Sequence, residues 1–360
     1  MAAACQSALD CQLNGACVAG ACVCDRGWQG ADCGNMSLAA PTVAFGYGTS
    51  NSSSWGGGPP VWDAVSGQYH LYVTEVAGGC GMSTWSFMST AVHTVAQRVT
   101  GPYRRVGLAI PVQTHNTLYV YSPVDKLHLI YHIGAAANPP SCNPLYPNCT
   151  GGRTAGTQGL RPPAGWPHDT CHTAGGAHVH YSTSLEGPWL NGGALDIDTS
   201  GMPPTAGSSN PAPYIFPNGT VLMIGRGRDA VEGQIKHNIF LYRAPAWNAT
   251  YSWVRGTGVD GAINVGNGKV MTEDPVLWRG RRGFHILFHS HPNLTHAWSL
   301  DGLTWHWSGN VMGPVVVGGG DHERPRVVVD ANGDVAVLFI SQEVGPDDAA
   351  RTLAFPVADT

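Results

Sequence analysis

The chain has 360 residues, of which 43% are hydrophobic and 12% are charged, and its formal net charge is −5. This hydrophobic fraction supports a sizeable core and excludes general disorder. The mild acidity, with only three lysines, argues against nucleic-acid binding, and no apolar run reaches the ~18 residues of a membrane span. The 48 Gly and 26 Pro favour a turn-rich β protein, because both residues break helices and mark turns.

Cysteines are concentrated at the N-terminus. Six of the ten fall between Cys5 and Cys33, in a stretch too short to build a core, and such stretches are normally held by disulfides in an oxidising compartment. The paired C-x2-C spacing of a zinc knuckle is missing. Spacing alone leaves fifteen connectivities open for six cysteines. The other four are Cys80, Cys142, Cys149 and Cys171.

N-glycosylation sequons point to the same compartment. Composition predicts about two by chance, whereas six asparagines precede a non-proline residue and then Ser or Thr. They are Asn35, Asn51, Asn148, Asn218, Asn248 and Asn293. The first residues carry neither the basic nor the apolar region of a signal peptide. We therefore expect a secreted glycoprotein whose signal peptide is absent from this chain.

The segment Cys22–Cys33, C-V-C-D-R-G-W-Q-G-A-D-C, resembles an EGF-like module. Its C-x-C, its Gly-Trp pair, the following Gly and the final Cys match that family's signature, over about residues 5–33. The resemblance implies the disulfides Cys5–Cys17, Cys11–Cys22 and Cys24–Cys33. No acidic consensus precedes the first cysteine, so calcium is not expected. We place the module at residues 1–36, as a spacer or as a surface for contact with another extracellular protein.

From about residue 41 onward, one pattern recurs five times: a Pro-flanked apolar strand, a short polar turn and a second apolar strand. Turns such as Asn218-Gly219 favour two-residue hairpins. Four copies are followed by a further pair of strands. Four strands per unit, repeated around an axis, is typical of a β-propeller. We predict an all-β protein with a five-bladed β-propeller over residues 41–360, preceded by the small disulfide-rich EGF-like module.

Two segments fall outside this repeat. The fifth copy leaves room for about one more strand, so we expect Pro41–Gly48 to complete the last blade, since an unpaired edge would leave the ring open. The Gly- and Pro-rich stretch from about 134 to 176 interrupts blade II and carries three of the later cysteines. We predict a disulfide-tied surface insertion there.

In a propeller, the starts of the first strands and the ends of the second strands open on one face around the axis. Four of the six glutamates fall at these positions, at Glu75, Glu273, Glu323 and Glu343. Crowded carboxylates repel one another, so some pKa values rise while others stay low. This split provides the acid and the base that hydrolysis of a glycosidic bond needs. The predicted catalytic residues are Glu273, Asp274, Glu323 and Glu75.

The same face is predicted to bind sugar, through polar side chains that hydrogen-bond hydroxyl groups and tryptophans that stack on sugar rings. The predicted substrate-binding residues are His115, Asn116, Asn210, Arg226, Asp229, His289, Trp55 and Trp85. A structural alternative stays open, because Asp-Pro and Asn-Pro also start strands for backbone reasons, and Arg–Glu pairs often tie blades together. Histidines alternate along two strands, but strand histidines are more often not ligands, so neither a metal nor another cofactor is predicted.

At Glu273-Asp274-Pro275, Asn210-Pro211 and Glu323-Arg324-Pro325, and at its Gly-Pro-Trp and Gly-Pro-Tyr outer turns, the domain resembles the five-bladed propeller glycoside hydrolases. These are the arabinanase, xylosidase and invertase type, especially glycoside hydrolase family 43 and its relatives. The resemblance spans roughly residues 41–360. It implies hydrolysis of a cell-wall or extracellular-matrix polysaccharide, with Glu323 as the proton donor.

The first blade departs from the family pattern. Family members place an aspartate there, whereas this chain reads Gly56-Gly57-Gly58-Pro59. Glu75, at the end of the second strand, is the nearest replacement. Two functions therefore stay open: a secreted glycoside hydrolase, and a non-catalytic carbohydrate-binding or adhesion protein that has lost the blade I aspartate. In both, the predicted ligand is a polysaccharide or another glycan.

Overall fold

The computed structural model describes residues 4–41, 46–48, 53–111, 113–134, 176–202, 209–231, 234–254, 262–263, 272–290, 293–312, 322–343 and 350–358. The predicted insertion lies outside the described residues, apart from its two ends. The same is true of Asn51, Asn148, Cys142, Cys149 and Cys171. Among the sequons that are described, Asn35, Asn218 and Asn248 are exposed, as a glycosylation site must be.

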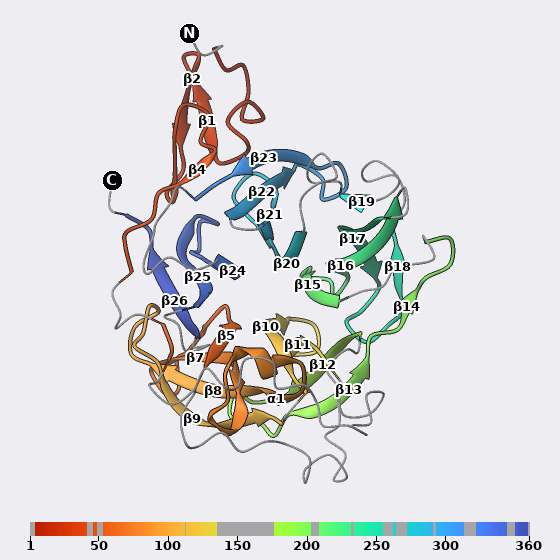
Figure 1. Cartoon of the computed structure of the whole chain (residues 1–360). Coiled ribbons are helices and arrows are strands. Elements are labelled where there is room, and N and C mark those ends of the chain that lie inside the picture. The colour runs from red at the N-terminus through yellow and green to blue at the C-terminus, as the bar shows by residue number, and fades with distance from the viewer. Residues whose placement is uncertain are drawn as a thin grey trace.

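Five sheets, all antiparallel except for one short parallel pair in blade III, stand around a central axis, which confirms the predicted five-bladed propeller (Figure 1). Blade I contains β5 (Ser54–Gly57), β6 (Val61–Asp63), β7 (Gln68–Val76), β8 (Ser89–Ala96) and β9 (Arg104–Ile110). Blade II contains β10 (His115–Ser122), β11 (Leu127–Ile133), β12 (Ala177–Ser182) and β13 (Leu190–Ala194). Blade III contains β14 (Ile197–Asp198), β15 (Ser209–Ile215), β16 (Val221–Val231), β17 (Gln234–Ala244), β18 (Tyr251–Trp253) and β19 (Ala262–Ile263). Blade IV contains β20 (Thr272–Arg279), β21 (Phe284–Ser290), β22 (Asn293–Ser299) and β23 (His306–Asn310), and blade V contains β24 (His322–Val329), β25 (Val335–Glu343) and β26 (Ala350–Pro356).

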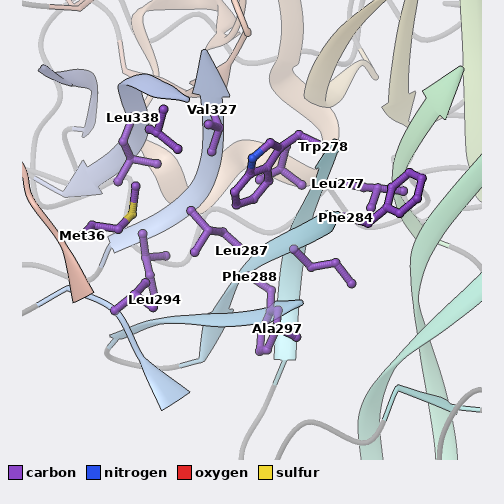
Figure 2. Close-up of a cluster of buried hydrophobic side chains, with 14 of the residues drawn as sticks. Met36, Leu277, Trp278, Phe284, Leu287, Phe288, Leu294, Ala297, Val327 and Leu338 are labelled. Atoms are coloured by element: carbon purple, nitrogen blue, oxygen red, sulfur yellow. The ribbon is translucent and has the colours of Figure 1, made fainter. Parts of the chain in front are cut away.

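The first strand of each blade lies next to the axis, and the second and third strands are buried between neighbouring blades. Because both faces of these middle strands are covered, they are apolar along most of their length, and every residue of β21 is buried. Side chains of blades IV and V belong to one buried cluster, in which Leu287 of blade IV faces blade V with its Val327 and Leu338 (Figure 2). This packing fixes the inner strands, and therefore the residues at their starts.

The ring is closed by the segment that precedes blade I. Tyr47 pairs with Thr352 of β26, and Leu38 pairs with Val357 just beyond that strand. The backbone N–H of each residue in the Tyr47–Thr352 pair donates to the other's carbonyl, at 2.8 and 3.0 Å. The expected closure of blade V by the N-terminal segment is therefore confirmed at Tyr47.

Helical turns occur, in the part of the chain that the structure describes, only between β7 and β8. They are η1 (Ala77–Gly79), η2 (Met82–Thr84) and α1 (Trp85–Met88). This connection packs on Trp55 at the start of β5. Cys80, within it, forms a disulfide whose partner lies outside the described residues. No described helix is long and apolar enough to cross a membrane.

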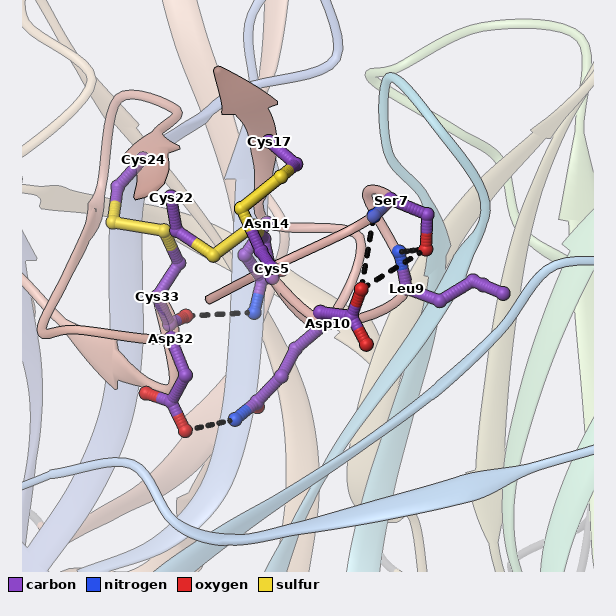
Figure 3. The surroundings of a disulfide bond; sticks show 12 residues. Cys5, Ser7, Leu9, Asp10, Asn14, Cys17, Cys22, Cys24, Asp32 and Cys33 are labelled. Carbon is purple, nitrogen blue, oxygen red and sulfur yellow. Dashed lines mark hydrogen bonds between the residues drawn. A yellow bond between two sulfur atoms is a disulfide. The ribbon is translucent and has the colours of Figure 1, made fainter. Parts of the chain in front are cut away.

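The N-terminal segment consists of two short hairpins, β1 (Gly15–Val18) with β2 (Ala21–Cys24) and β3 (Trp28–Gln29) with β4 (Asn35–Met36). Its three disulfides are the pairs that the resemblance implies (Figure 3). Within this disulfide-bonded segment, the buried Asn14 Nδ2 donates to the carbonyl oxygen of Cys33 at 3.1 Å. The disulfides take the place of a hydrophobic core in this small unit.

The segment is docked on the turns of blades IV and V. Trp28 is buried, with its ring centroid 4.8 Å from that of His296. Asp25 forms an ion pair with Arg282, in the β20–β21 turn. A Cβ on Gly27 would lie 3.0 Å from Val335, so only a glycine lets the two backbones approach this closely. The module is thus part of one packed unit with the propeller, and the expectation of a spacer is wrong.

Candidate active site

Each inner strand starts with a β-bulge that contains a residue in the left-handed region. Four of these residues carry polar side chains: Asn116 (φ 56°), Asn210 (φ 50°), Asp274 (φ 51°) and Arg324 (φ 53°). Bulges re-aim side chains and recur beside active sites. Here they bring side chains from blades II, III, IV and V into contact at one end of the axis.

Asp274 is the centre of this group and is fully buried. Its Oδ1 accepts hydrogen bonds from Nδ2 of Asn116, at 2.9 Å, and from Nδ2 of Asn210. Asn116 Oδ1 in turn accepts from Arg326 at 2.6 Å, which fixes the orientation of the amide. Asp274 Oδ2 has no hydrogen-bond partner among the described residues, so this oxygen has unused acceptor capacity.

Arg326 supplies positive charge behind the group. It is 1% exposed, and burial lowers the pKa of its guanidinium to about 10, while Asp274 opposes this shift. It stays charged at neutral pH and balances the buried aspartate through Asn116. Sequence reasoning missed this residue, although an arginine that directly precedes the valine run of an inner strand is a signal for a buried partner.

Glu323 lies beside Asp274 and is partly open to solvent, with a side-chain exposure of 22%. Its Oε2 accepts from Arg324 at 2.7 Å, and its Oε1 lies 3.9 Å from His289 Nδ1. One polar atom each from Asp274, His289 and Glu323 lie within 4.8 Å of one another. Burial, with smaller contributions from Asp274 and Glu273, raises the pKa of Glu323 to about 7, against the opposing charge of Arg324.

Glu273, the neighbouring acid on blade IV, has a different environment. Its Oε1 lies 2.8 Å from the guanidinium of Arg226 on β16. Both side chains are about one-fifth exposed, at 19% and 18%. An ion pair with arginine favours the carboxylate form. The site therefore holds one acid that stays protonated to near-neutral pH and a second that is paired with a cation.

His115, on blade II, is buried behind the site. Its Nε2 accepts from Arg324 at 2.8 Å, and its Nδ1–H donates to Ser89 Oγ at 2.8 Å. Burial, and secondarily Arg324, lower the pKa of His115 well below its usual value, so the ring is neutral with a fixed tautomer. The Trp85 ring lies against it, with the ring centroids 4.5 Å apart and the planes tilted by 32°, and is 41% exposed, which leaves indole surface for a ligand.

Three predicted residues lie apart from this group or outside the description. The Glu75 carboxylate accepts from the Tyr47 hydroxyl and from Arg105 Nε at 3.3 Å, so it faces the closing segment and the outer strand of blade I. Trp55 is buried beneath Arg324, 5.0 Å from its guanidinium, and has no free face for a sugar. Asp229 lies on β16, but its side chain is not described.

Among the described residues, blade I places no acid at the bulge end of the axis, and the reason is steric. In the β5 bulge the left-handed residue is Gly56 (φ 84°). A Cβ there would lie 2.8 Å from both Cβ and Cδ of Arg324, closer than side-chain atoms approach. Arg324 therefore occupies the space in which a blade I aspartate would lie.

A mainly apolar cavity of about 650 Å³ opens at the other end of the axis. Its walls are later residues of the inner strands, including Leu118, Tyr214, Trp278 and Val327. Because these residues follow the bulges in every inner strand, the cavity is separate from the acids. The titratable groups of the candidate site all belong to the bulge end.

The model of the EGF-like domain family matches residues 5–33. No curated protein sequence matches the chain. Among solved structures, the fold is similar to that of Zg3597, a family 117 glycoside hydrolase from the marine bacterium Zobellia galactanivorans, at a TM-score of 0.59 and 12% identity, over 89% of this chain and 90% of that one. It is also similar to a thermostable family-43 glycoside hydrolase (TM-score 0.53, 11% identity, 88% of this chain and 92% of that one).

An exo-β-1,3-galactanase from Phanerochaete chrysosporium, solved with galactose, is similar at a TM-score of 0.52 and 9% identity, over 89% of this chain and 64% of that longer chain. These likenesses establish the fold, which is that of the glycoside hydrolase propellers. The chain is thus a glycoside-hydrolase-like propeller fused to an EGF-like module.

Proposed function

We propose that the chain is a secreted glycoside hydrolase that cleaves a cell-wall or extracellular-matrix polysaccharide at the bulge end of the propeller axis. The observation that carries the proposal is Glu323, a partly exposed carboxyl group whose pKa is raised to about 7. A general acid must be protonated near the working pH. Glu323 would donate its proton to the glycosidic oxygen as the bond to the anomeric carbon breaks.

Asp274 is proposed to support Glu323 without touching the substrate. Its carboxylate is fully buried, and an oxygen of it lies within 4.8 Å of one of Glu323. The two carboxylates that flank a scissile bond lie ~5–5.5 Å apart in retaining enzymes and ~6.5–9.5 Å apart in inverting ones. A buried carboxylate this close acts through its charge, which favours the protonated form of Glu323.

Glu273 is proposed as the second catalytic carboxylate. It is partly exposed and paired with Arg226, so it is available as an anion. In that form it either removes a proton from the attacking water or attacks the anomeric carbon itself. The configuration of the first product, read by NMR, distinguishes these two roles.

Binding of the sugar is proposed for Trp85, which the buried His115 supports from behind, while the buried Asn116 and Asn210 hold Asp274 beneath the site. The exposed indole of Trp85 offers an apolar face to a sugar ring. The three disulfides and the exposed sequons support an extracellular location.

The second candidate is a non-catalytic carbohydrate-binding or adhesion protein. The observation that favours it is Gly56, which leaves the start of the first strand of blade I without an acid. This function predicts saturable glycan binding with no product.

The test is a panel of polysaccharides, including a β-1,3-galactan, screened first for binding and then for release of reducing sugar. Glu323→Gln should abolish release, and Asp274→Asn should reduce it at least a hundredfold at pH 7. Asp32→Asn, an exposed carboxylate of the EGF-like module, is the matched control. Binding without product by the unaltered chain would establish the second candidate, and unchanged turnover in both variants would exclude the proposed roles.

A further inference from the structure

A second cluster of titratable side chains lies where blade I meets blade II, away from the axis. His70 on β7 and His93 on β8 are buried, whereas Glu186, in the turn after β12, has a side-chain exposure of 62%. His70 Nδ1 lies 2.8 Å from His93 Nε2 and 3.8 Å from Glu186 Oε1. His93 Nδ1 lies 3.6 Å from Glu186 Oε2. One polar atom of each residue falls within 4.8 Å of the others.

The far side of the His70 ring is held by neighbouring polar groups. Its Nε2 lies 3.2 Å from Ser66 Oγ and 3.8 Å from Asp63 Oδ2. When Nε2 carries the hydrogen, it donates to Ser66 Oγ and faces the Asp63 carboxylate. The lone pair of the ring is then on Nδ1, which faces His93 and Glu186. A carboxylate behind the second nitrogen is the arrangement that orients metal-binding histidines. Burial also lowers the pKa of both histidines, that of His93 to about 4, so both are in the neutral, ligating form at pH 7.

The turn that carries Glu186 is fastened to blade I. The hydroxyl of Tyr72, a fully buried residue of β7, donates to the carbonyl of Leu185. Glu186 N donates to Ser184 Oγ at 3.1 Å. The backbone next to the carboxylate is therefore fixed against the blade that carries both histidines, so little order has to be gained on binding a ligand.

Two other histidine pairs provide an internal comparison. His132 and His180 lie 3.0 Å apart in blade II, and His285 and His296 lie 3.1 Å apart in blade IV. Within the described residues, neither pair belongs to a set of three such groups with the spacing of the blade I cluster. The carboxylate beside the blade I pair is therefore not a general feature of histidine pairing in this fold.

We propose that His70, His93 and Glu186 bind a divalent zinc ion that links blade I to blade II. Zinc takes imidazole nitrogen and carboxylate oxygen at ~2.0–2.2 Å, so two ligand atoms of a tetrahedral ion lie ~3.3–3.6 Å apart. His93 Nδ1 lies 3.6 Å from Glu186 Oε2 and His70 Nδ1 lies 3.8 Å from Glu186 Oε1, so the two Nδ1 atoms and the carboxylate need only small movements to reach this spacing. The 2.8 Å contact between His70 Nδ1 and His93 Nε2 is given up when the two Nδ1 atoms bind the ion. The exposed side of Glu186 leaves the fourth position for water.

The test measures zinc alone on the purified full chain, first stripped with a chelator. Titration against a chromophoric zinc indicator should give binding that Glu186→Gln weakens at least tenfold. His93→Gln should weaken it similarly. His306→Gln, which removes an exposed histidine of blade IV, is the matched control and should leave zinc affinity unchanged. Zinc should also raise the melting temperature of the unaltered chain and not that of Glu186→Gln.

Glu186→Gln changes an exposed side chain, so this variant is expected to fold even if His93→Gln does not. Equal zinc affinity in the unaltered chain and in Glu186→Gln would overturn the proposal. So would zinc binding that Glu323→Gln removes and Glu186→Gln preserves, because the ion would then lie at the axis. An absence of binding at 100-fold excess zinc over protein would also overturn it.

Discussion

Replacing Glu323 by glutamine should make the protein more stable at alkaline pH while it removes the proposed general acid. The pKa of this carboxyl group rises from an ordinary value of 4.5 to about 7 in the folded chain. The folded state therefore holds the proton more tightly than the unfolded state. The contribution of Glu323 to the free energy of unfolding is fully present below pH 4.5 and is lost as the pH rises through 7. At about 1.4 kcal/mol per pKa unit, the native carboxylate costs about 3 kcal/mol above pH 7.

Glu323→Gln removes this cost, because the amide keeps the shape of the protonated acid and cannot ionise. For a chain of this length the unfolding entropy is about 0.8 kcal/mol per kelvin, so 3 kcal/mol corresponds to a rise of about 4 °C in melting temperature. Calorimetry of both proteins should show this gap at pH 8 and almost none at pH 4.5. An equal melting-temperature difference at the two pH values would refute the electrostatic account of Glu323.

Three further changes test other parts of the structure. Asp274→Asn removes a charge that raises the pKa of Glu323, so the alkaline limb of any residual hydrolysis should move to lower pH in a pH–rate profile. Gly56→Asp should lower the free energy of unfolding by about 1–3 kcal/mol through overpacking. Gly67→Asp controls for backbone strain, because Gly67 also has a positive φ but no atom lies within 4 Å of its position for a Cβ. If denaturant titrations gave the two variants equal losses of unfolding free energy, the steric account would be contradicted. Trp28→Ala should cost about 3–5 kcal/mol, whereas alanine at the half-exposed tryptophan of β6 should change little; an unaltered calorimetric transition in Trp28→Ala would show that the module is not docked.

The repeat made the architecture predictable, because each blade repeats the same strand and turn chemistry. Asn218-Gly219 specifies its hairpin locally, and the EGF-like signature fixes its disulfides within a short stretch. The grouping of Asp274 with Glu323 also followed, since strand starts in a propeller must meet at the axis. Docking of Trp28 could not be predicted, because its partner His296 is distant in sequence and nothing local marks the contact.

The predicted site residues that the structure places elsewhere are those whose position depends on the direction in which the side chain points. Glu75 lies at a strand end, as Asp274 does at a strand start, but its carboxylate faces Arg105. Trp55 was indistinguishable from Trp85 in the sequence, yet one is buried and the other exposed. Such differences depend on register and on bulges, which residue types alone do not determine.

Closure of the ring at Tyr47 and docking of Trp28 have a consequence for biosynthesis. Tyr47 and Trp28 precede Thr352 and His296 in the chain by roughly 300 and 270 residues, so the ribosome makes each of them long before its partner. The module is therefore synthesised before its docking surface exists. A chain truncated before β26 would keep His296 but lack the Tyr47–Thr352 and Leu38–Val357 pairs that close the ring.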